Sequence, residues 1–226
     1  MGTVLLNSSG NCVNILVIDV GGQAVKALAT GHKQPVKIPS GPGMTARKMV
    51  DAVKAATADW EYEGVSLGIP GKVINGKPVE NPPNLGNGWV GFDFQAAFGC
   101  PVKILNDAAI QALGNYRGKR MLFLGLGTGL GSALIIEGII HPLELGDLPY
   151  RDGTYAENLG VAGLERLGKK EWSKRVWEAV KQFHNAMQTD YVVVGGGKSK
   201  LTGKLPRYTF RSDNSSAFTG GYRLWE

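Results

Sequence analysis

Short apolar runs that end at glycine turns mark the first part of the chain. Asn14–Val20 ends at Gly21-Gly22, and a second run, Ala24–Thr30, begins directly after this turn. A third run, Val65–Ile69, ends in another glycine-rich turn. Apolar runs of this length, bounded by turn residues, are typical of buried strands. The pattern therefore predicts three strands, and the tight turn makes the first two a hairpin.

Helical patterns lie between these strands. Thr45 is of the type that caps helices, and apolar side chains recur on one face of the segment that follows it. A stretch rich in Asn, Gly and Pro is loop-like. The predicted order in this region is a helix over residues 45–59, a loop over 74–91, a helix over 92–98, a strand over 102–105 and a helix over 106–116.

The same pattern begins again in the second half. Apolar runs over Met121–Leu126 and Ser132–Ile136 flank a glycine-rich turn. An amphipathic helix is predicted over Lys170–Met187, before a short strand over Tyr191–Val194. A strand, a glycine turn and a second strand therefore occur once in each half, which favours two similar lobes.

We predict an α/β fold of two lobes, residues 1–106 and residues 107–226, each of which contributes one glycine hairpin to a shared cleft. Among the 226 residues, 43% are hydrophobic and 19% charged, as is usual for a globular protein. No apolar run reaches the roughly 18 residues of a membrane span. The N-terminus has no signal-peptide pattern, and Cys12 and Cys100 are too few for a disulfide framework. We expect a cytoplasmic protein with no membrane partner.

The net charge of +6 comes from the C-terminal part of the chain. Residues 1–168 hold 14 Lys/Arg and 14 Asp/Glu, whereas residues 169–226 hold 11 Lys/Arg and 5 Asp/Glu. A basic excess in one region favours a polyanionic partner such as a nucleic acid, a nucleotide or polymeric phosphate. A solvated helix face followed by a basic tail would give the same composition, so charge alone does not decide between these interpretations.

The first glycine turn closely follows Asp19, an acidic residue near the end of its strand. The amides of Gly21 and Gly22 can bind phosphate oxygens, and Lys26 lies close by in the sequence. A carboxylate in this position suits a water-mediated contact with Mg²⁺. An ordinary hairpin with a capping aspartate is the alternative.

The second glycine turn is longer, with Gly127, Thr128 and Gly129 at its centre. Successive N–H groups in such a turn form an anion-binding nest, to which the threonine hydroxyl adds a donor. The spacing G-x-G-x-G-x-G, followed by a strand, differs from the G-x-G-x-x-G and helix of a dinucleotide site. A hairpin that binds nothing is the alternative, but the length and context of the motif favour phosphate.

Polar residues suited to a sugar hydroxyl lie elsewhere along the chain. Asp107 opens a predicted helix, where a carboxylate usually serves only as a cap. A position between two phosphate loops, however, suits a general base, and Asn106 could hold a neighbouring hydroxyl. Glu144 and Asp147 bracket a glycine and could accept hydrogen bonds from vicinal hydroxyls, or could form a solvated turn.

Three further features complete the candidates. Gly195, Gly196 and Gly197 follow an apolar run and could form the floor of a nucleotide site or a simple turn. The five tryptophans are expected mostly in the core or at an interface, although Trp89 lies in the Asn-rich loop and could stack on the face of a sugar. The three histidines have no partner at metal-ligand spacing and are assigned no site, and the two distant cysteines form no cluster of the kind that binds structural zinc, so no zinc site is expected.

The order of these motifs resembles that of the ROK family of sugar kinases, in the actin–hexokinase superfamily. The likeness is carried by the segments DVGGQAVK, GIPG, NPPNLGNGW, LNDAA, GLGTGLGSAL, ELGD and VVVGGG, which together span about Ile15–Lys200. The ordered series is far more specific than any one segment. Within the family, the likeness is greatest to the polyphosphate/ATP glucokinase branch.

The resemblance implies two ribonuclease-H-like lobes and transfer of a phosphoryl group, with Mg²⁺, from ATP or polyphosphate to the 6-hydroxyl of glucose or a similar hexose. It also implies a homodimer and no nucleic-acid partner. Asp107 matches the catalytic base of the family, and Asp19 matches its metal-proximal aspartate. The other candidate contacts are to sugar at Gly71, Asn84, Asn106, Glu144 and Asp147, to phosphate at Gly21, Gly22, Gln23, Lys26, Gly127, Thr128 and Gly129, and to nucleotide at Gly195, Gly196 and Gly197.

Two positions depart from the family pattern. The first phosphate loop usually has threonine where this chain has Gln23. Asp147 replaces a histidine that binds sugar and, in many members, ligates a structural zinc together with a cysteine cluster. These departures leave two alternatives open. One is a kinase for another acceptor, such as mannose or an amino sugar, and the other is a non-catalytic sensor of sugar or nucleotide.

Overall fold

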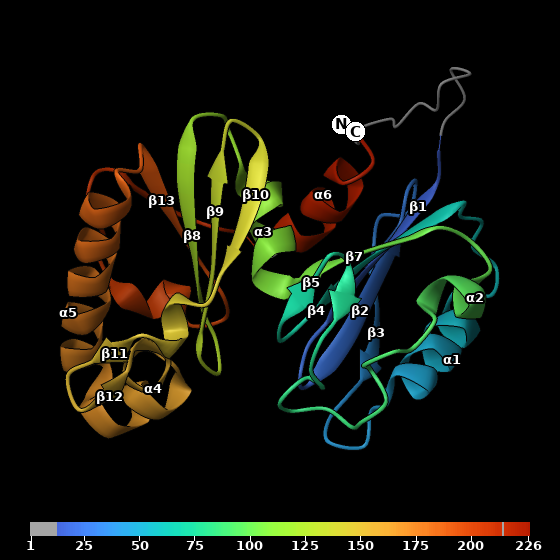
Figure 1. Ribbon diagram of the computed structural model, residues 1–226, viewed down its shortest axis with the longest axis horizontal. Coiled ribbons are helices and arrows are strands. Elements are labelled where there is room, and N and C mark those ends of the chain that lie inside the picture. The colour runs from blue at the N-terminus through green and yellow to red at the C-terminus, as the bar shows by residue number, and fades with distance from the viewer. Residues whose placement is uncertain (1–12, 214) are drawn as a thin grey trace. The chain divides into compact units, whose positions relative to one another are not determined.

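The computed structural model describes residues 13–213 and 215–226, which form two compact units (Figure 1). The first unit comprises the chain up to Ile110 and also Ala217–Glu226, whereas the second comprises Gln111–Ser216. Each unit contains one five-stranded mixed sheet with helices packed against it. The predicted α/β class is therefore confirmed.

The first unit contains the strands β1 to β7 and most of the short helices. Its elements are β1 (Ile15–Val20), β2 (Ala24–Ala29), β3 (Val36–Pro39), α1 (Ala46–Ala56), β4 (Gly64–Ile69), β5 (Val73–Ile74), β6 (Lys77–Pro78), α2 (Phe94–Phe98) and β7 (Val102–Asn106). Two helices contain the points at which the chain passes between the units, α3 (Asp107–Asn115) and α6 (Ser216–Arg223).

The sheet of the first unit has the strand order β3-β2-β1-β4-β7. β1, β2 and β3 form an antiparallel meander, whereas β1, β4 and β7 are parallel. The register sets Asp19 opposite Gly68, and Gly68 opposite Leu105. The carboxyl ends of the three parallel strands therefore meet at one edge of the sheet, where Asp19 and Asn106-Asp107 both lie.

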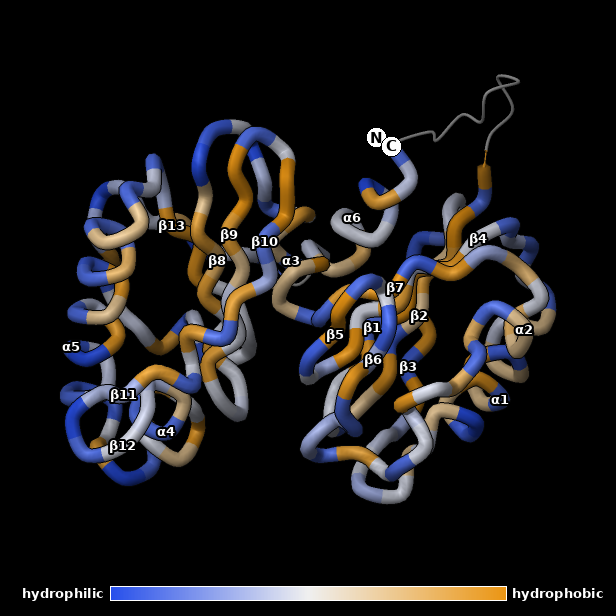
Figure 2. The backbone as a smooth tube through the Cα atoms, viewed as in Figure 1, coloured by the Kyte–Doolittle hydropathy of each residue, from blue (hydrophilic) through white to orange (hydrophobic). Residues whose placement is uncertain are grey.

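Successive side chains of a strand point to opposite faces of the sheet. The two faces of β1 therefore contribute to two different cores. Leu16 and Ile18 pack with α1 and α2, whereas Ile15 and Val17 pack with residues of α3 and α6. Figure 2 shows the apolar character of these strands. The C-terminal residues therefore complete the core of the first unit, and the expectation of a basic tail is wrong for α6.

Local signals position the first two helices as the sequence predicts. The Thr45 side chain accepts a hydrogen bond from the Lys48 N–H at 3.2 Å, which confirms the predicted cap of α1. The Asp93 carboxylate caps α2 in the same way, with the Ala96 N–H at 2.9 Å. By contrast, Trp89 is fully buried and donates its indole N–H to the Met44 carbonyl. Trp89 therefore lies in the core, as expected of most tryptophans, and the alternative that it stacks on a sugar is wrong.

The second unit repeats the strand order of the first. Its elements are β8 (Arg120–Leu126), β9 (Leu130–Ile136), β10 (Ile139–Leu143), the 3₁₀ turn η1 (Leu145–Asp147), β11 (Pro149–Tyr150), β12 (Gly153–Thr154), α4 (Tyr155–Leu159), α5 (Val161–Met187), β13 (Tyr191–Gly195), η2 (Ser199–Thr202) and β14 (Thr209–Arg211). The sheet order is β10-β9-β8-β13-β14, with β8, β9 and β10 antiparallel and β8, β13 and β14 parallel.

Helix α5 consists of two helical segments joined at Gly168, which has a non-helical φ of 70°. The segment after Gly168 agrees with the predicted helix over Lys170–Met187, whereas the segment from Val161 to Gly168 was not predicted. The buried stripe of Trp172, Val176 and Val180 packs on the sheet as the predicted amphipathic pattern requires. No helix in the described part of the chain is both long and apolar enough to cross a bilayer.

Candidate functional site

The first unit gathers most of its predicted site residues at one sheet edge. β1, β4 and β7 end there. The first glycine turn and Gly71 lie in the loops after β1 and β4, and Asn106-Asp107 lie where β7 ends and α3 begins. Strand spacing of about 4.8 Å puts β1 and β7, two strands apart, roughly 10 Å from each other. Asn84 joins this group, because a Cβ built on Gly22 would lie 3.2 Å from the Cβ of Asn84.

The first glycine turn is fixed through its carbonyl groups. The Gly21 N–H donates to the Ala24 carbonyl at 3.0 Å. Ser40, after β3, donates its N–H to the Gln23 carbonyl at 3.1 Å and its hydroxyl to the Gly21 carbonyl. Gly22 and Gln23 lie at the tip of the turn. These hydrogen bonds fix the carbonyl groups of the turn. The backbone at its tip can therefore accommodate an anion.

Asp19 and Lys26 form a pair behind this turn. They are opposite each other in the β1–β2 register, and the Lys26 Nζ lies 3.5 Å from the Asp19 Oδ2. The Asp19 side chain is only 16% exposed, and burial raises its pKa above the ordinary value, while the charge and hydrogen bond of Lys26 act in the opposite direction. A carboxylate held this way beside a glycine turn is of the kind that can hold Mg²⁺ through water and phosphate oxygens.

The amide of Asn106 connects two loops of the first unit. Its Oδ1 accepts hydrogen bonds from the N–H groups of Ala108 and Ala109 at 2.8 and 3.3 Å, which caps α3. Its Nδ2 donates to the Gly71 carbonyl at 2.8 Å. Gly71 itself has a φ of 97°, a conformation that favours glycine. The hydrogen bond therefore fixes Gly71 beside the start of α3.

Asp107 is half-buried at the first position of α3. Its Oδ1 accepts a hydrogen bond from the Ala108 N–H at 2.8 Å, so it contributes to the helix start as the capping alternative requires. The capping contact does not exclude a second role, because a carboxylate can accept about four hydrogen bonds on its two oxygens. Asp107 lies next to Asn106, at the sheet edge that also holds the Asp19 pair.

The second glycine turn, in the second unit, is held by main-chain groups. The Gly127 N–H donates to the Gly129 carbonyl at 3.2 Å, and the Val161 N–H lies 3.1 and 3.3 Å from the carbonyls of Gly127 and Thr128. The start of α5 therefore engages the carbonyl side of the turn. Thr128 is exposed, so its hydroxyl can reach a ligand.

Gly195, Gly196 and Gly197 lie beside this turn within the second unit. Gly195 is opposite Gly125 in the parallel register of β13 and β8. Gly196 has a φ of 81°, and a Cβ built on it would lie 2.3 Å from the Leu126 carbonyl oxygen. Leu126 directly precedes Gly127, so the GGG turn packs against the base of the second glycine turn.

The two acidic residues of the ELGD segment flank Leu145 and Gly146 of η1. Ser132 fixes this segment, because its hydroxyl donates to the Leu143 carbonyl at 2.8 Å and accepts from the Leu145 N–H at 3.1 Å. A Cβ built on Gly146 would lie 2.7 Å from the Leu130 carbonyl oxygen, so only glycine permits this close approach. Glu144 and Asp147 are exposed on either side of it.

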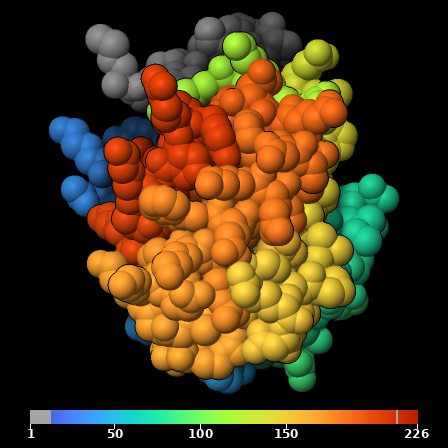
Figure 3. All heavy atoms as spheres, turned by 90° about the vertical axis from the view of Figure 1, so that its left-hand side faces the viewer, coloured from blue at the N-terminus to red at the C-terminus, as the bar shows by residue number. Residues whose placement is uncertain are grey.

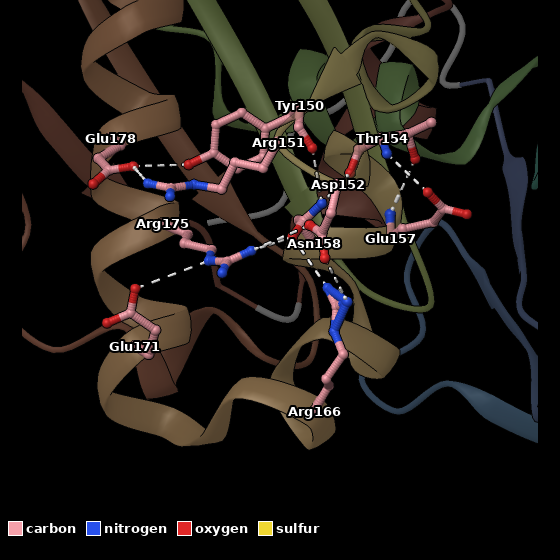
Figure 4. Close-up of polar contacts among 10 residues, drawn as sticks. All are labelled: Tyr150, Arg151, Asp152, Thr154, Glu157, Asn158, Arg166, Glu171, Arg175 and Glu178. Atoms are coloured by element: carbon pink, nitrogen blue, oxygen red, sulfur yellow. Dashed lines mark hydrogen bonds and ion pairs between the residues drawn. The ribbon is translucent and has the colours of Figure 1, made fainter.

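A buried asparagine that the sequence did not reveal supports this segment (Figure 4). Asn158 is fully buried, and its Nδ2 donates to the carbonyls of Tyr150 and Thr154, both at 3.0 Å. Its Oδ1 accepts from the guanidinium groups of Arg166 and Arg175. Asn158 thus joins the short β11–β12 hairpin, which follows η1, to helix α5. A lone asparagine in a helix carries no sequence signal for this role.

No group of three His, Cys, Asp or Glu residues that could hold a metal ion occurs within residues 13–213 and 215–226. Cys12 lies outside the described residues. Cys100 is a free thiol in the first unit, and burial raises its pKa. Any metal at the first glycine turn would therefore have Asp19 as its protein carboxylate, together with ligands from phosphate and water.

Comparison with known proteins adds to this geometry. The sequence pattern of the ROK family matches residues 15–144. The polyphosphate glucokinase of Mycobacterium tuberculosis is 29% identical, over 83% of this chain and 78% of its own length. The bifunctional enzyme NanE/NanK of Brucella melitensis is 27% identical over 55% of this chain, and the match spans 27% of that enzyme.

Among solved structures, the inorganic polyphosphate/ATP-glucomannokinase of Arthrobacter sp. strain KM aligns with a TM-score of 0.81 at 22% identity. The alignment covers 94% of this chain and 98% of that one. This likeness confirms the predicted actin–hexokinase-type fold with two sheet-containing lobes.

Proposed function

Because this chain belongs to the ROK family, we propose that it is a sugar kinase that transfers a phosphoryl group from ATP or polyphosphate to the 6-hydroxyl of glucose or a similar hexose. One observation carries this proposal. Asp19, the first glycine turn and Asn106-Asp107 lie at the ends of three adjacent parallel strands of one sheet. A carboxylate suited to a hydroxyl and a turn suited to phosphate are thus placed on one rigid support.

In the proposed reaction the hydroxyl oxygen of the sugar attacks the terminal phosphorus of the donor in line. The bond to the bridging oxygen breaks, and ADP or a shortened polyphosphate leaves. Asp107 accepts the proton of the hydroxyl. Phosphoryl transfer depends mainly on positioning and on neutralising charge. The amides of the two glycine turns and Thr128 supply donors for the phosphate oxygens.

Asp19 would hold Mg²⁺ through water, and the bound ion would neutralise negative charge on the donor phosphates. Lys26 would orient Asp19, because its ammonium group contacts one carboxylate oxygen. Gln23 would present its backbone, rather than a threonine hydroxyl, to the phosphate.

Asn84 and Asn106, with Gly71, would hold sugar hydroxyls on the side of Asp107, and Glu144 and Asp147 would accept hydrogen bonds from other hydroxyls. Gly195–Gly197 would form the floor under the nucleotide of ATP. A homodimer remains an expectation from the family.

The decisive test replaces Asp107 by asparagine. The amide side chain would retain the ability to cap α3 but could not accept the proton. We expect kcat to fall by at least ~10²-fold, the low end for a general base, while sugar binding by calorimetry is retained. Asp93→Asn is the matched control, because Asp93 caps α2 through the Ala96 N–H in the same way. Near-wild-type turnover in Asp107→Asn would reject the mechanism.

A panel of acceptors and donors tests the wider proposal. Glucose, mannose and amino sugars are each offered with Mg-ATP and with polyphosphate, and sugar phosphate is measured. Turnover with mannose or an amino sugar but not with glucose would show that the acceptor is another sugar. Asp147 makes this outcome plausible, because it replaces a histidine that binds sugar in the family. Sugar binding without product in every mixture would instead identify a non-catalytic sensor.

A further inference from the structure

A group of cations in the second unit has no place in the reaction just described. Residues 196–212 contain five Lys/Arg and no Asp/Glu. Lys200, Lys204 and Arg207 are exposed, and Lys198 is half-buried. None of these four takes part in an ion pair with another described residue. Their charge is thus available to an external partner.

This segment runs alongside helix α5. The Ser173 hydroxyl donates to the Leu201 carbonyl at 3.2 Å, and the Trp177 indole N–H donates to the Thr202 carbonyl at 3.1 Å. About two helical turns further on, the His184 ring stacks on Tyr208 with 3.7 Å between centroids. The segment and the helix therefore proceed in the same direction. In Figure 3 the orange atoms of α5 and the redder atoms of the later chain adjoin on one face.

The contacting side of α5 is bordered by lysines. Lys170 and Lys181 are exposed and, at helical spacing, lie within about 60° of Trp177 around the axis. Eleven residues separate them, a length of about 16 Å along an α-helix. Lys174 lies between them, but its Nζ is 3.4 Å from a carboxylate oxygen of Glu171, which partly neutralises it.

The segment starts at the second glycine turn. The Lys198 N–H donates to the Leu126 carbonyl at 3.2 Å, and Leu126 immediately precedes Gly127. At the other end, Arg211 is occupied within the fold, because its guanidinium donates to Ser199, Thr202 and Gly203. The segment that carries these cations therefore begins beside the predicted phosphate turn, and Arg211 ties its end back to Ser199, Thr202 and Gly203.

We infer that these cations bind the non-reacting part of a polyphosphate chain whose terminal phosphate lies at the second glycine turn. The inference rests on the proposed kinase function and assigns a surface to one of its donors. A linear polyanion gains affinity by releasing counterions to each cation it meets, and this gain falls with salt. Lys200 and Lys204 follow the three glycines assigned to the nucleotide of ATP, so their loss should affect long-chain polyphosphate more than ATP. The basic track consists of Lys170, Lys181, Lys198, Lys200, Lys204 and Arg207.

The test compares donors of different length. KM and kcat are measured for Mg-ATP, tripolyphosphate and long-chain polyphosphate in the wild type and in the double variant Lys200→Gln/Lys204→Gln. We expect the KM for long-chain polyphosphate to rise at least ~5-fold and to depend less steeply on salt, while kcat and the values for ATP and tripolyphosphate stay unchanged. Lys33→Gln/Lys37→Gln removes the same charge from exposed sites of the first unit and serves as the control.

The outcomes separate the two proposals. No turnover with any donor would overturn the kinase function itself. Turnover with an unchanged KM for long-chain polyphosphate in the double variant would overturn only the basic track, as would ATP-dependent turnover without measurable polyphosphate binding. Equal loss of affinity for ATP would show that the lysines belong to the nucleotide site. A DNA oligonucleotide that binds as tightly as polyphosphate, and is weakened by the same variant, would identify a nucleic-acid surface instead.

Discussion

The two glycine hairpins occupy equivalent positions in sheets of the same strand order, yet each is held by a different part of the protein. In both sheets an antiparallel meander is followed by two strands parallel to its first strand. The first hairpin is fixed largely by the hydroxyl and N–H of Ser40. The second is fixed by the Val161 N–H at the start of α5. One hairpin therefore depends on a side chain, and the other on close packing of backbone.

The hairpins also differ in charge. In each hairpin we compare the second pair of facing residues, counted from the turn. This pair is Asp19–Lys26 in the first hairpin and Gly125–Gly131 in the second. The first hairpin thus carries a carboxylate suited to Mg²⁺ bound through water, together with Lys26, whereas the second offers backbone amides and Thr128. The cations of the basic track lie on other elements of the second unit. Hairpins of equivalent topology therefore differ in the groups that they offer to a ligand.

The largest effect on this comparison is expected from Gly160→Ala. A Cβ on Gly160 would lie 2.2 Å from the Thr128 carbonyl oxygen, so the second hairpin must move. Overpacking of this kind costs about 1–3 kcal/mol, and we expect kcat/KM to fall by about 10- to 100-fold if that cost appears at the active site. Kinetics with each donor and thermal unfolding measure the two effects.

Gly43→Ala is the control for this change, because a Cβ at Gly43 would meet nothing within 4 Å. Wild-type kinetics in Gly160→Ala would show that the second hairpin tolerates displacement and does not bind the donor.

Asp19→Asn tests the charged pair of the first hairpin. Burial raises the folded pKa of Asp19 above its ordinary value, so the folded state favours the protonated carboxyl. The wild type therefore loses free energy of unfolding as the pH rises through the folded pKa. Asn cannot ionise, so the variant should not lose stability in this range, and at neutral pH it should be at least as stable as the wild type. Activity should nevertheless fall about tenfold or more, because charge beside the phosphate is removed.

Melting temperatures across a pH series measure the stability of the variant, and steady-state kinetics measure its activity. Together they distinguish a loss of activity alone from a general loss of folding. A variant that loses both stability and activity at neutral pH would show that the carboxylate mainly stabilises the fold.

Ser40→Ala should loosen only the first hairpin. The change removes the hydroxyl that donates to the Gly21 carbonyl, a contribution of about 1 kcal/mol. We expect a rise of about fivefold in donor KM with little change in kcat, and Ser40→Thr should restore the wild-type value because it keeps the hydroxyl. An unchanged KM in Ser40→Ala would mean that the Ser40 N–H alone holds the turn.

The contrast between Ser40 and the glycines also shows what the sequence could predict. The strands were predictable because Ile15–Val20 and Gly64–Ile69 are mostly apolar and are followed by glycine-containing turns. Site residues at the ends of predicted strands, such as Asp19 in the first run and Asn106 after Val102–Leu105, could be proposed for the same reason. Ser40 could not be proposed, because its role depends on the pairing of β2 with β3 and no motif surrounds it.

Longer-range packing was equally hidden. Residues 216–223 carry two glycines and few large apolar side chains, which gave no reason to expect a buried helix. A Cβ on Gly221 would lie 2.2 Å from the Val17 Cγ1. Helix α6 can therefore approach β1 this closely only because Gly221 has no side chain. The burial of Asn158 was also hidden, because its partners, 4 to 17 residues away, surround it only once the β11–β12 hairpin and α5 have formed.

The smallest effect concerns the hairpin beside η1. The hydrogen bonds of Arg151 and Tyr150 hold the pKa of Glu178 below its usual value of 4.5 (Figure 4). A lowered folded pKa contributes stability that is present above the unfolded value and is lost as the pH falls through the folded one. Because the Glu178 side chain is 49% exposed, solvent screening limits this contribution to below about 1 kcal/mol.

Glu178→Gln should therefore be slightly less stable than the wild type above about pH 5 and should match it in stronger acid. Chemical denaturation over a pH series measures the difference in unfolding free energy. Glu165→Gln is the control, since Glu165 is exposed and makes no ion pair with a described residue, and its difference should stay flat. A difference for Glu178 that persists unchanged in acid would show that the hairpin is held by neutral hydrogen bonds rather than by the charge of the carboxylate.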